Sequence, residues 1–291
     1  MKYYSLNHNS KPCSFADAVK KGLAPDRGLY FPEKIPILPK KFFEEIEGKS
    51  IPKMALEVIE PYVGGQINNN KLLEIVTETL DFKFPIVEIT NKIAALELFQ
   101  GPTLAFKDVG ARFMARTLGH LNKGSKEKIT VMVATSGDTG GAVANGFLGV
   151  EGIKVVILYP KGKVSEIQEK QLTTLGQNIT ALEVDGVFDD CQEMVKNAFL
   201  DASLSSVKLT SANSINVARW LPQMFYYFIA YRALKHKNKK LVFSVPSGNF
   251  GNICAGIISM KLGLPISHFI ASTNANDTVP RLSLIHISEP T

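Results

Sequence analysis

The sequence predicts an α/β fold in which parallel β-sheets are flanked by helices. From residue 91 onward, short apolar runs alternate with segments of helical periodicity. Runs such as 129–135 and 154–159 are rich in β-branched residues and nearly continuous in apolar character. Strands that are buried on both faces of a parallel sheet have this composition. With 291 residues, the chain is long enough for two domains.

A strand, a loop and a helix follow one another twice in this region. The strand over 129–135 leads through a glycine-rich loop to a helix over 142–149 and then to the strand 154–159. The second unit is expected to have a strand, a loop, a helix and a strand over 241–245, 246–251, 252–262 and 266–271. Such strand–helix–strand units build a parallel sheet with helices on its faces.

The first 85 residues lack the alternation of strands and helices seen later in the chain, and they predict an additional N-terminal domain. Ser14 and Asp17 form a capping-box pattern for a helix over 15–22, which Gly22 ends. A second helix is expected over 67–80, and Pro85 marks the boundary. We therefore expect an N-terminal domain over 1–85 and a main region over 86–281.

Composition excludes several classes of protein. Hydrophobic residues make up 45% and charged residues 21%, which excludes a mainly disordered chain. Cys13, Cys191 and Cys254 are far apart, so neither a disulfide framework nor a metal site is supported. The uncharged stretch 241–260 is broken by proline, asparagine and glycine, so we expect no membrane span and a cytoplasmic protein. The net charge of +6 does not by itself indicate nucleic acid, and the basic run 235–240 is expected to be a solvated helix end.

Two loops have the chemistry of an anion site. Residues 135–141 and 247–252 each follow a strand, contain glycines and hydroxyl or amide side chains, and precede a helix. Helix N-termini at the carboxyl ends of parallel strands present free N–H groups to phosphates. Neither loop has the dinucleotide-binding or P-loop spacing. Each alone is consistent with an ordinary tight turn, but the two together favour a ligand such as a monophosphate.

Lys107 lies where its amine would lose its charge easily. It follows a strand expected over 93–98 and precedes a segment with apolar residues at helical spacing. A cation at the positive end of a helix, among apolar neighbours, has a lowered pKa. A neutral lysine is the form that reacts with a carbonyl group. On position alone, a surface lysine paired with Asp108 is equally consistent.

These segments together resemble the threonine synthase family. The resemblance is carried by Gly101–Asp108 (GPTLAFKD), Ala134–Gly140 (ATSGDTG), Pro246–Asn252 (PSGNFGN), His8–Ser10 and Gly22–Tyr30 (GLAPDRGLY). The PTxxFKD pattern alone indicates the broader group of fold-type-II, tryptophan synthase β-like enzymes that use pyridoxal 5′-phosphate. The N-terminal segments and Asn213–Asn216 (NSIN) narrow the resemblance to threonine synthase.

The resemblance implies a role for each matching residue. Lys107 would bind pyridoxal phosphate covalently and then move protons. The phosphate of the cofactor would be held by Ser247, Gly248, Asn249, Phe250 and Gly251, and Asp138 would lie near its ring hydroxyl. Substrate would be held by Thr135, Ser136, Asn213, Ser214 and Arg219, with Arg219 in a helix that Asn213 and Ser214 begin.

The implied reaction is that of a lyase. O-phospho-L-homoserine and water would give L-threonine and phosphate by γ-elimination and β-addition of water. A related phospholyase that gives a keto acid, or a cofactor-binding fragment without turnover, are the alternatives. Members of the family are longer, so region 86–281 is expected to lack the last sheet elements and the hydroxyl residue that faces the pyridine nitrogen. Residues 282–291 fit nothing in the family and are expected to be extraneous.

Overall fold

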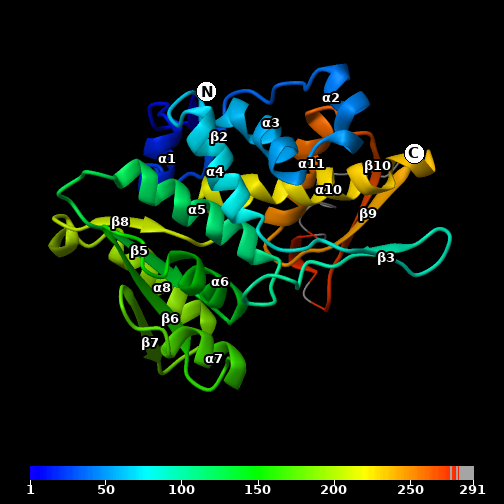
Figure 1. Ribbon diagram of the computed structural model, residues 1–291. Coiled ribbons are helices and arrows are strands. Elements are labelled where there is room, and N and C mark those ends of the chain that lie inside the picture. Colours follow the sequence, from blue (N-terminus) through cyan, green and yellow to red (C-terminus); the bar gives the residue numbers. More distant parts are fainter. Residues whose placement is uncertain (276, 280, 282–291) are drawn as a thin grey trace, which may run out of the picture.

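The computed structural model describes residues 1–275, 277–279 and 281, and it contains two parallel sheets, the larger at the lower left and the smaller at the right of Figure 1. The larger sheet has the order β7-β6-β5-β8, and all its strand pairs are parallel. Its strands are Ile129–Ala134 (β5), Ile153–Pro160 (β6), Ile179–Val184 (β7) and Lys208–Ser211 (β8). A second parallel pair joins Leu241–Pro246 (β9) to Ile266–Ser272 (β10). The predicted fold class is confirmed.

The strand order places a topological switch point between β5 and β8. After β5 the chain adds β6 and β7 on one side, and it then returns to the other side of β5 as β8. Open α/β sheets bind their ligands beyond the carboxyl ends of the strands at such a point. The loops that follow β5 and β8 are therefore the place to look for a site.

Helices cover both faces of the larger sheet, as the continuous apolar strands predict. On one face lie Lys107–Asn122 (α5), Asp138–Phe147 (α6) and Glu166–Thr173 (α7), which pack against one another within the main core. On the other face, Phe188–Ala198 (α8) packs Cys191 and Val195 on Ala134 and Leu158. The central strand β5 therefore has no exposed residue, whereas the edge strand β7 exposes Thr180, Leu182 and Glu183.

The N-terminal region shares the main hydrophobic core with the rest of the chain. Its elements are Tyr3–Ser5 (β1), Phe15–Lys21 (α1), Tyr30–Pro32 (β2), Lys40–Glu45 (α2), Ile51–Val63 (α3) and Asn69–Thr79 (α4). Phe31 stacks on Trp220 with ring centroids 5.5 Å apart, and Phe42 meets Phe228 edge-on at 5.8 Å. The antiparallel hairpin Ile86–Glu88 (β3) and Ala94–Leu96 (β4) then leads toward α5.

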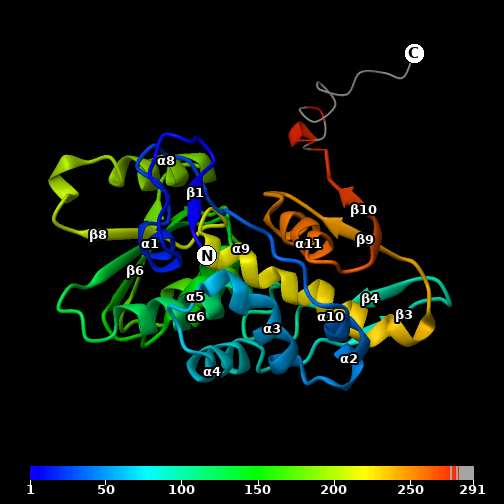
Figure 2. The same cartoon turned by 90° about the horizontal axis from the view of Figure 1, so that it is seen from above.

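The helix Met224–Leu234 (α10) runs through the middle of the molecule (Figure 2). It packs against α3 on one side and against Gly251–Lys261 (α11) on the other. All residues from Met224 to Ala230 are buried. A helix that is buried on every side shows no amphipathic period, which explains why the sequence pattern does not reveal it.

Two helix starts differ from the predictions. The first, α6, begins at Asp138 rather than at 142, because Gly137 adopts φ 140° and turns the chain, and Asp138 suits the positive end of a helix. The second, Val217–Trp220 (α9), begins after Asn216, whose side chain accepts a hydrogen bond from Ala218 N–H at 3.0 Å. The predicted start at Asn213 and Ser214 is therefore wrong. The other predicted elements are confirmed, most of them to within about two residues at each end, as is the capping box of α1.

The basic run 235–240 is more than a solvated helix end. Lys235 pairs with Glu47 at 3.3 Å, Lys237 pairs with Glu88 at 2.5 Å, and the amine of Lys239 donates to the carbonyl of Asn91 at 2.7 Å. These lysines join the end of α10 to the N-terminal region and to the β3–β4 hairpin.

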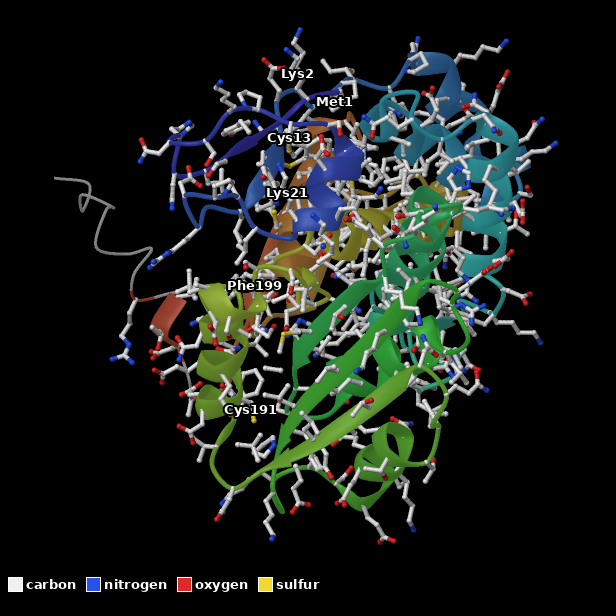
Figure 3. The ribbon with its side chains drawn as sticks, turned by 90° about the vertical axis from the view of Figure 1, so that its left-hand side faces the viewer. Met1, Lys2, Cys13, Lys21, Cys191 and Phe199 are labelled. Carbon is white, nitrogen blue, oxygen red and sulfur yellow. The ribbon has the colours of Figure 1, made fainter. Side chains whose placement is uncertain are left out.

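The cysteines are all free thiols. Figure 3 shows Cys13 in the N-terminal segment and Cys191 on α8, well apart. None of the helices that the structure describes combines the length and the apolar character needed to cross a membrane. The predicted tail, residues 282–291, lies outside the described residues.

Candidate active site

The loop that follows β8 is joined to the end of β5 by Asn213. Its side-chain oxygen accepts a hydrogen bond from the N–H of Ala134, the last residue of β5, at 3.2 Å, and its side-chain nitrogen donates to the carbonyl of Ala134 at 2.8 Å. Both polar atoms of the side chain are used for this purpose.

Lys107 is the first residue of α5 and is largely enclosed. Burial lowers the pKa of its amine from the ordinary value, the Asp138 carboxylate opposes this shift, and the Arg219 guanidinium adds to it. The amine lies 5.9 Å from the ring centroid of Phe106. The structure thus brings Asp138 and Arg219 each within electrostatic range of Lys107.

Asp108, next to Lys107, faces a different partner. Its carboxylate accepts hydrogen bonds from the N–H of Thr103 at 3.0 Å and from the Thr103 hydroxyl at 2.5 Å. Burial raises the pKa of this carboxyl, and the hydrogen bonds from Thr103 oppose that shift. Asp108 therefore braces the loop before α5, and the alternative of a surface Lys107–Asp108 pair finds no support.

Asp138 is held in place by α7. The side-chain nitrogen of Gln168 donates to its carboxylate at 2.7 Å, and the side-chain oxygen of Gln168 accepts from the Ser165 hydroxyl at 3.0 Å. A Cβ at Gly137 would lie only 2.4 Å from the Gln168 side chain, so this approach requires glycine. The Thr135 hydroxyl stabilises the same turn, since it accepts from the N–H groups of Gly137 and Gly140 at 2.9 and 2.8 Å.

The second glycine loop ends at the start of α11. The Ser247 hydroxyl donates to the side-chain oxygen of Asn252 at 3.0 Å, and the side-chain nitrogen of Asn252 donates to the Pro246 carbonyl at 2.8 Å. These bonds close the loop on itself. The first N–H groups of a helix have no partner within it, so those of Gly251 and Asn252 are available to an anion.

Gly251 connects this loop with the segment that carries Arg219. A Cβ at Gly251 would lie 3.7 Å from Cβ of Ser214 and 3.9 Å from Cβ of Trp220, and at Gly248 it would meet nothing within 4 Å. Neither glycine has a positive φ; in this loop Phe250 has one, at 59°. The loop therefore leaves open space beside it, although its left-handed residue is not a glycine.

Arg219 is the largest fully enclosed side chain of the protein's described part, with 2% of its surface exposed. Its Nε and Nη1 have no hydrogen-bond partner in that part of the chain. Burial lowers the pKa of the guanidinium to about 10, while Tyr226 and Asp108 oppose the shift. Buried donors without acceptors are costly, and they point to a ligand that completes them.

A cavity of about 910 Å³ lies beside this arrangement. It is lined by Phe106, Tyr226, Tyr227 and Asn252 at one end and by strands β4 and β9 along its length. The residue before Lys107 and the residue after Gly251 therefore face one space.

The sequence patterns predicted the candidate site residues but not the residues that hold their backbone and side chains in place. Ser136 is exposed on the loop after β5, and Asn249 is exposed on the second loop. The residues that brace the site, Gln168, Tyr226 and Asn252, were not singled out. Asn252 ends the quoted PSGNFGN segment, so its position was a usable signal, whereas Gln168 and Tyr226 come from helices far along the chain.

Comparisons with known proteins show the family of the chain. Residues 2–80 match the threonine synthase N-terminal family, and residues 85–284 match the family of pyridoxal-phosphate-dependent enzymes. The threonine synthase of Buchnera aphidicola (subspecies Baizongia pistaciae) is 48% identical over 284 residues, which cover 97% of this chain and 66% of that enzyme. The chain thus spans slightly less than two thirds of the length of this curated relative.

Solved structures show the same relationship. The crystal structure of threonine synthase from Escherichia coli superimposes with a TM-score of 0.91 at 43% identity, covering 100% of this chain and 68% of that one. Pyridoxal-phosphate-bound threonine synthase from Brucella melitensis gives 0.90 at 40% identity, covering 97% of this chain and 62% of that one. The chain belongs to the threonine synthase family of pyridoxal-phosphate-dependent enzymes.

Proposed function

We propose that this chain carries the cofactor-binding and catalytic residues that convert O-phospho-L-homoserine and water into L-threonine and phosphate. The observation that carries the proposal is the position of Lys107 within electrostatic range of Asp138 and Arg219, with Trp220, the residue after Arg219, beside Gly251 at the start of α11. A half-buried amine with a lowered pKa, within electrostatic range of a buried guanidinium with unpartnered donors, suits a substrate that is both an amine and a phosphate.

The residues present fit pyridoxal phosphate. Its phosphate group would be held by the loop of Ser247, Gly248, Asn249, Phe250 and Gly251, where the start of α11 offers free N–H groups and open space. Its aldehyde carbon would be held by Lys107, and Asp138 would face its ring hydroxyl. When bound, the cofactor acts as an electron sink that makes carbon–hydrogen bonds next to the substrate nitrogen acidic.

The Lys107 amine would take up and return protons at the substrate carbons. Its lowered pKa keeps a larger fraction of the amine neutral near pH 7, which a proton acceptor needs. The low dielectric that lowers this pKa also limits competition from water. We assign the proton transfers at Cα and Cγ to the Lys107 Nζ atom.

Arg219 would hold the phosphate that leaves. A guanidinium donates charge-assisted hydrogen bonds to a phosphate, and here Nε and Nη1 have no partner among the described residues. Ser214, beside Gly251, and the exposed Ser136 would add hydroxyl donors. We assign Thr135 and Asn213 an indirect part in substrate binding, because their side chains already stabilise the loops.

A second candidate function is cofactor binding without turnover. In the part of the chain that the structure describes, two strands that line the cavity have unpaired edges, and this favours a site that is not fully assembled in the chain alone. In the described residues, β4 is paired only with β3 and β9 only with β10, so each presents one unpaired edge. Both strands line the cavity, whose walls include Ile93, Leu96 and Val242. We propose that this apolar groove receives a strand from the portion by which the relatives exceed this chain.

Product analysis distinguishes these functions. The chain is incubated with pyridoxal phosphate and O-phospho-L-homoserine, and threonine, keto acid and inorganic phosphate are measured. Equal amounts of threonine and phosphate support the proposed function, and a keto acid with phosphate identifies the related phospholyase. A cofactor spectrum that responds to substrate without product identifies the binding fragment. No spectral change with either compound contradicts the proposal.

We also propose the division of the chain into an N-terminal domain over 1–85, a catalytic region over 86–281 and an extraneous tail, and a cytoplasmic location. Three free thiols are in keeping with a reducing compartment.

A further inference from the structure

Two consecutive tyrosines of α10 reach the two helix starts that form the site. The Tyr226 hydroxyl donates to the backbone carbonyl of Phe106, directly before Lys107. The Tyr227 hydroxyl donates to the backbone carbonyl of Asn252, directly after Gly251, at 2.8 Å. Both side chains are 5% exposed. Neighbouring residues on one buried helix therefore contact the lysine turn and the phosphate-loop turn.

Tyr226 supports a helix start that has no capping side chain of its own. The residue at the N-cap position of α5 is Phe106, whose side chain cannot accept the hydrogen bond that a capping residue normally accepts. The Tyr226 hydroxyl, from another helix, donates instead to the Phe106 carbonyl and so fixes the residue directly before Lys107.

The ring of Tyr227 packs against α11 at Gly256. A Cβ at Gly256 would lie 2.5 Å from Cζ of Tyr227, so the ring rests on the helix where a side chain is missing. The ring also packs edge-on against Phe243 and Phe269, with centroids 5.0 and 6.0 Å away. This packing directs the hydroxyl to the first turn of α11.

We propose that Tyr226 and Tyr227 are positioning residues that hold the Lys107 turn and the Gly251 turn at a fixed separation. One small molecule can then be held by both turns at once, because the rigid spacing between two residues of α10 sets the distance between them. This inference rests on the proposed use of Lys107 and the Gly251 loop for pyridoxal phosphate.

Hydrogen–deuterium exchange of the cofactor-free chain gives the first test, with Tyr226→Phe and Tyr227→Phe as the variants. Each substitution removes one hydroxyl and keeps the ring. Tyr226→Phe should speed exchange over residues 107–110 about fivefold and leave residues 251–254 unchanged, since a net hydrogen bond of about 1 kcal/mol to the Phe106 carbonyl is lost. Tyr227→Phe should speed exchange over 251–254 only. The control is Tyr231→Phe, a half-buried tyrosine one turn further along α10.

Two probes test the two ends of the site separately. Pyridoxal has the aldehyde but no phosphate, and pyridoxine 5′-phosphate has the phosphate but no aldehyde. Tyr226→Phe should slow the reaction of Lys107 with pyridoxal several-fold and spare pyridoxine phosphate binding, and Tyr227→Phe should do the reverse. Exchange and binding equal to those of Tyr231→Phe would overturn the inference, as would an equal loss of both probes in each variant. If the unmutated chain binds neither probe, the proposed function fails, and the exchange data still decide the inference.

Discussion

Lys107 owes its chemistry to its surroundings rather than to a charged partner. It begins a helix, lies in a largely enclosed position, and has Arg219 as a second cation nearby, so its charged form is destabilised. The apolar residues around Lys107 in the sequence predicted its position at a helix start among apolar neighbours. The nearby buried Arg219 could not be predicted, because it approaches Lys107 through the packing of α9 on α5.

Replacing Lys107 with methionine should change the pH dependence of stability. The unfolded chain holds a proton on this amine more tightly than the folded chain, so the cost of burying the charge is present at neutral pH. That cost disappears as the pH rises from the lowered pKa toward the ordinary value of 10.5. Lys107→Met should therefore be more stable than the parent at pH 7, with a difference that shrinks toward pH 10.5.

Urea unfolding of both proteins across this pH range measures the effect. Lys123→Met, at the exposed C-terminal end of α5, is the control for the loss of a lysine from the same helix. A constant difference for Lys107→Met would mean that the folded chain does not destabilise its charge.

Arg219→Lys should weaken substrate binding without weakening cofactor binding. The lysine keeps the charge and loses the two-pronged donor geometry. We expect O-phospho-L-homoserine to bind about 1.5–3 kcal/mol more weakly, the range for a hydrogen bond to a charged group. Titration of the cofactor absorbance with substrate gives both affinities.

The matched control for this substitution is Arg116→Lys, whose side chain pairs with Glu78 at 3.1 Å near the surface. Equal substrate affinity for Arg219→Lys and the parent would assign Arg219 to the fold alone.

At the level of elements, the loops were predicted better than the helices that support them. The glycines, hydroxyls and strand ends of both loops are local features that a sequence displays directly. The start of α6 was misplaced because a glycine pair inside it reads as loop, although Gly140 and Gly141 are helical here. Gly140 is required because a Cβ would lie 2.5 Å from the short, buried Thr135 side chain, whereas at Gly141 only the tip of the Gln171 side chain would have to move.

Gly251→Val should affect cofactor binding much more than stability. A valine side chain would fill the space between Ser214 and Trp220 that a phosphate would use, yet its Cβ makes only ordinary contacts there. We expect pyridoxal phosphate to bind at least tenfold more weakly, about 1.4 kcal/mol or more, and unfolding to change by less than about 1 kcal/mol.

Spectroscopic titration and urea unfolding test this pair of expectations. Gly48→Val is the control, since a Cβ at Gly48 meets nothing within 4 Å and Gly48 is far from the loop in the sequence. Unchanged cofactor affinity in Gly251→Val would refute the assignment of the phosphate to this loop.

At the level of the whole molecule, the composition of the strands predicts the fold class, but it does not predict that β4 and β9 each have an unpaired edge among the described residues. No local pattern predicts which strand lies beside β9, because pairing between distant strands depends on the complete chain. The groove between β4 and β9 is therefore visible only in three dimensions.

The C-terminal third of the E. coli enzyme, co-expressed as a separate polypeptide, should bind this chain and raise its turnover. Val242→Asp, which places a charge on the half-exposed wall of the groove, should abolish binding while leaving the chain folded. Ile257→Asp, on the similarly exposed surface of α11, should have no effect. Co-purification and threonine assays measure both outcomes, and equal binding by the two variants would exclude the groove.

The most direct test of the central claim is the absorbance spectrum of the purified chain with pyridoxal phosphate, followed by borohydride reduction and peptide mapping. We predict a visible band that is lost in Lys107→Ala and kept in Lys123→Ala, with the reduced cofactor attached to Lys107. A chain that forms no band, or a band whose cofactor maps to a different lysine, would contradict the account.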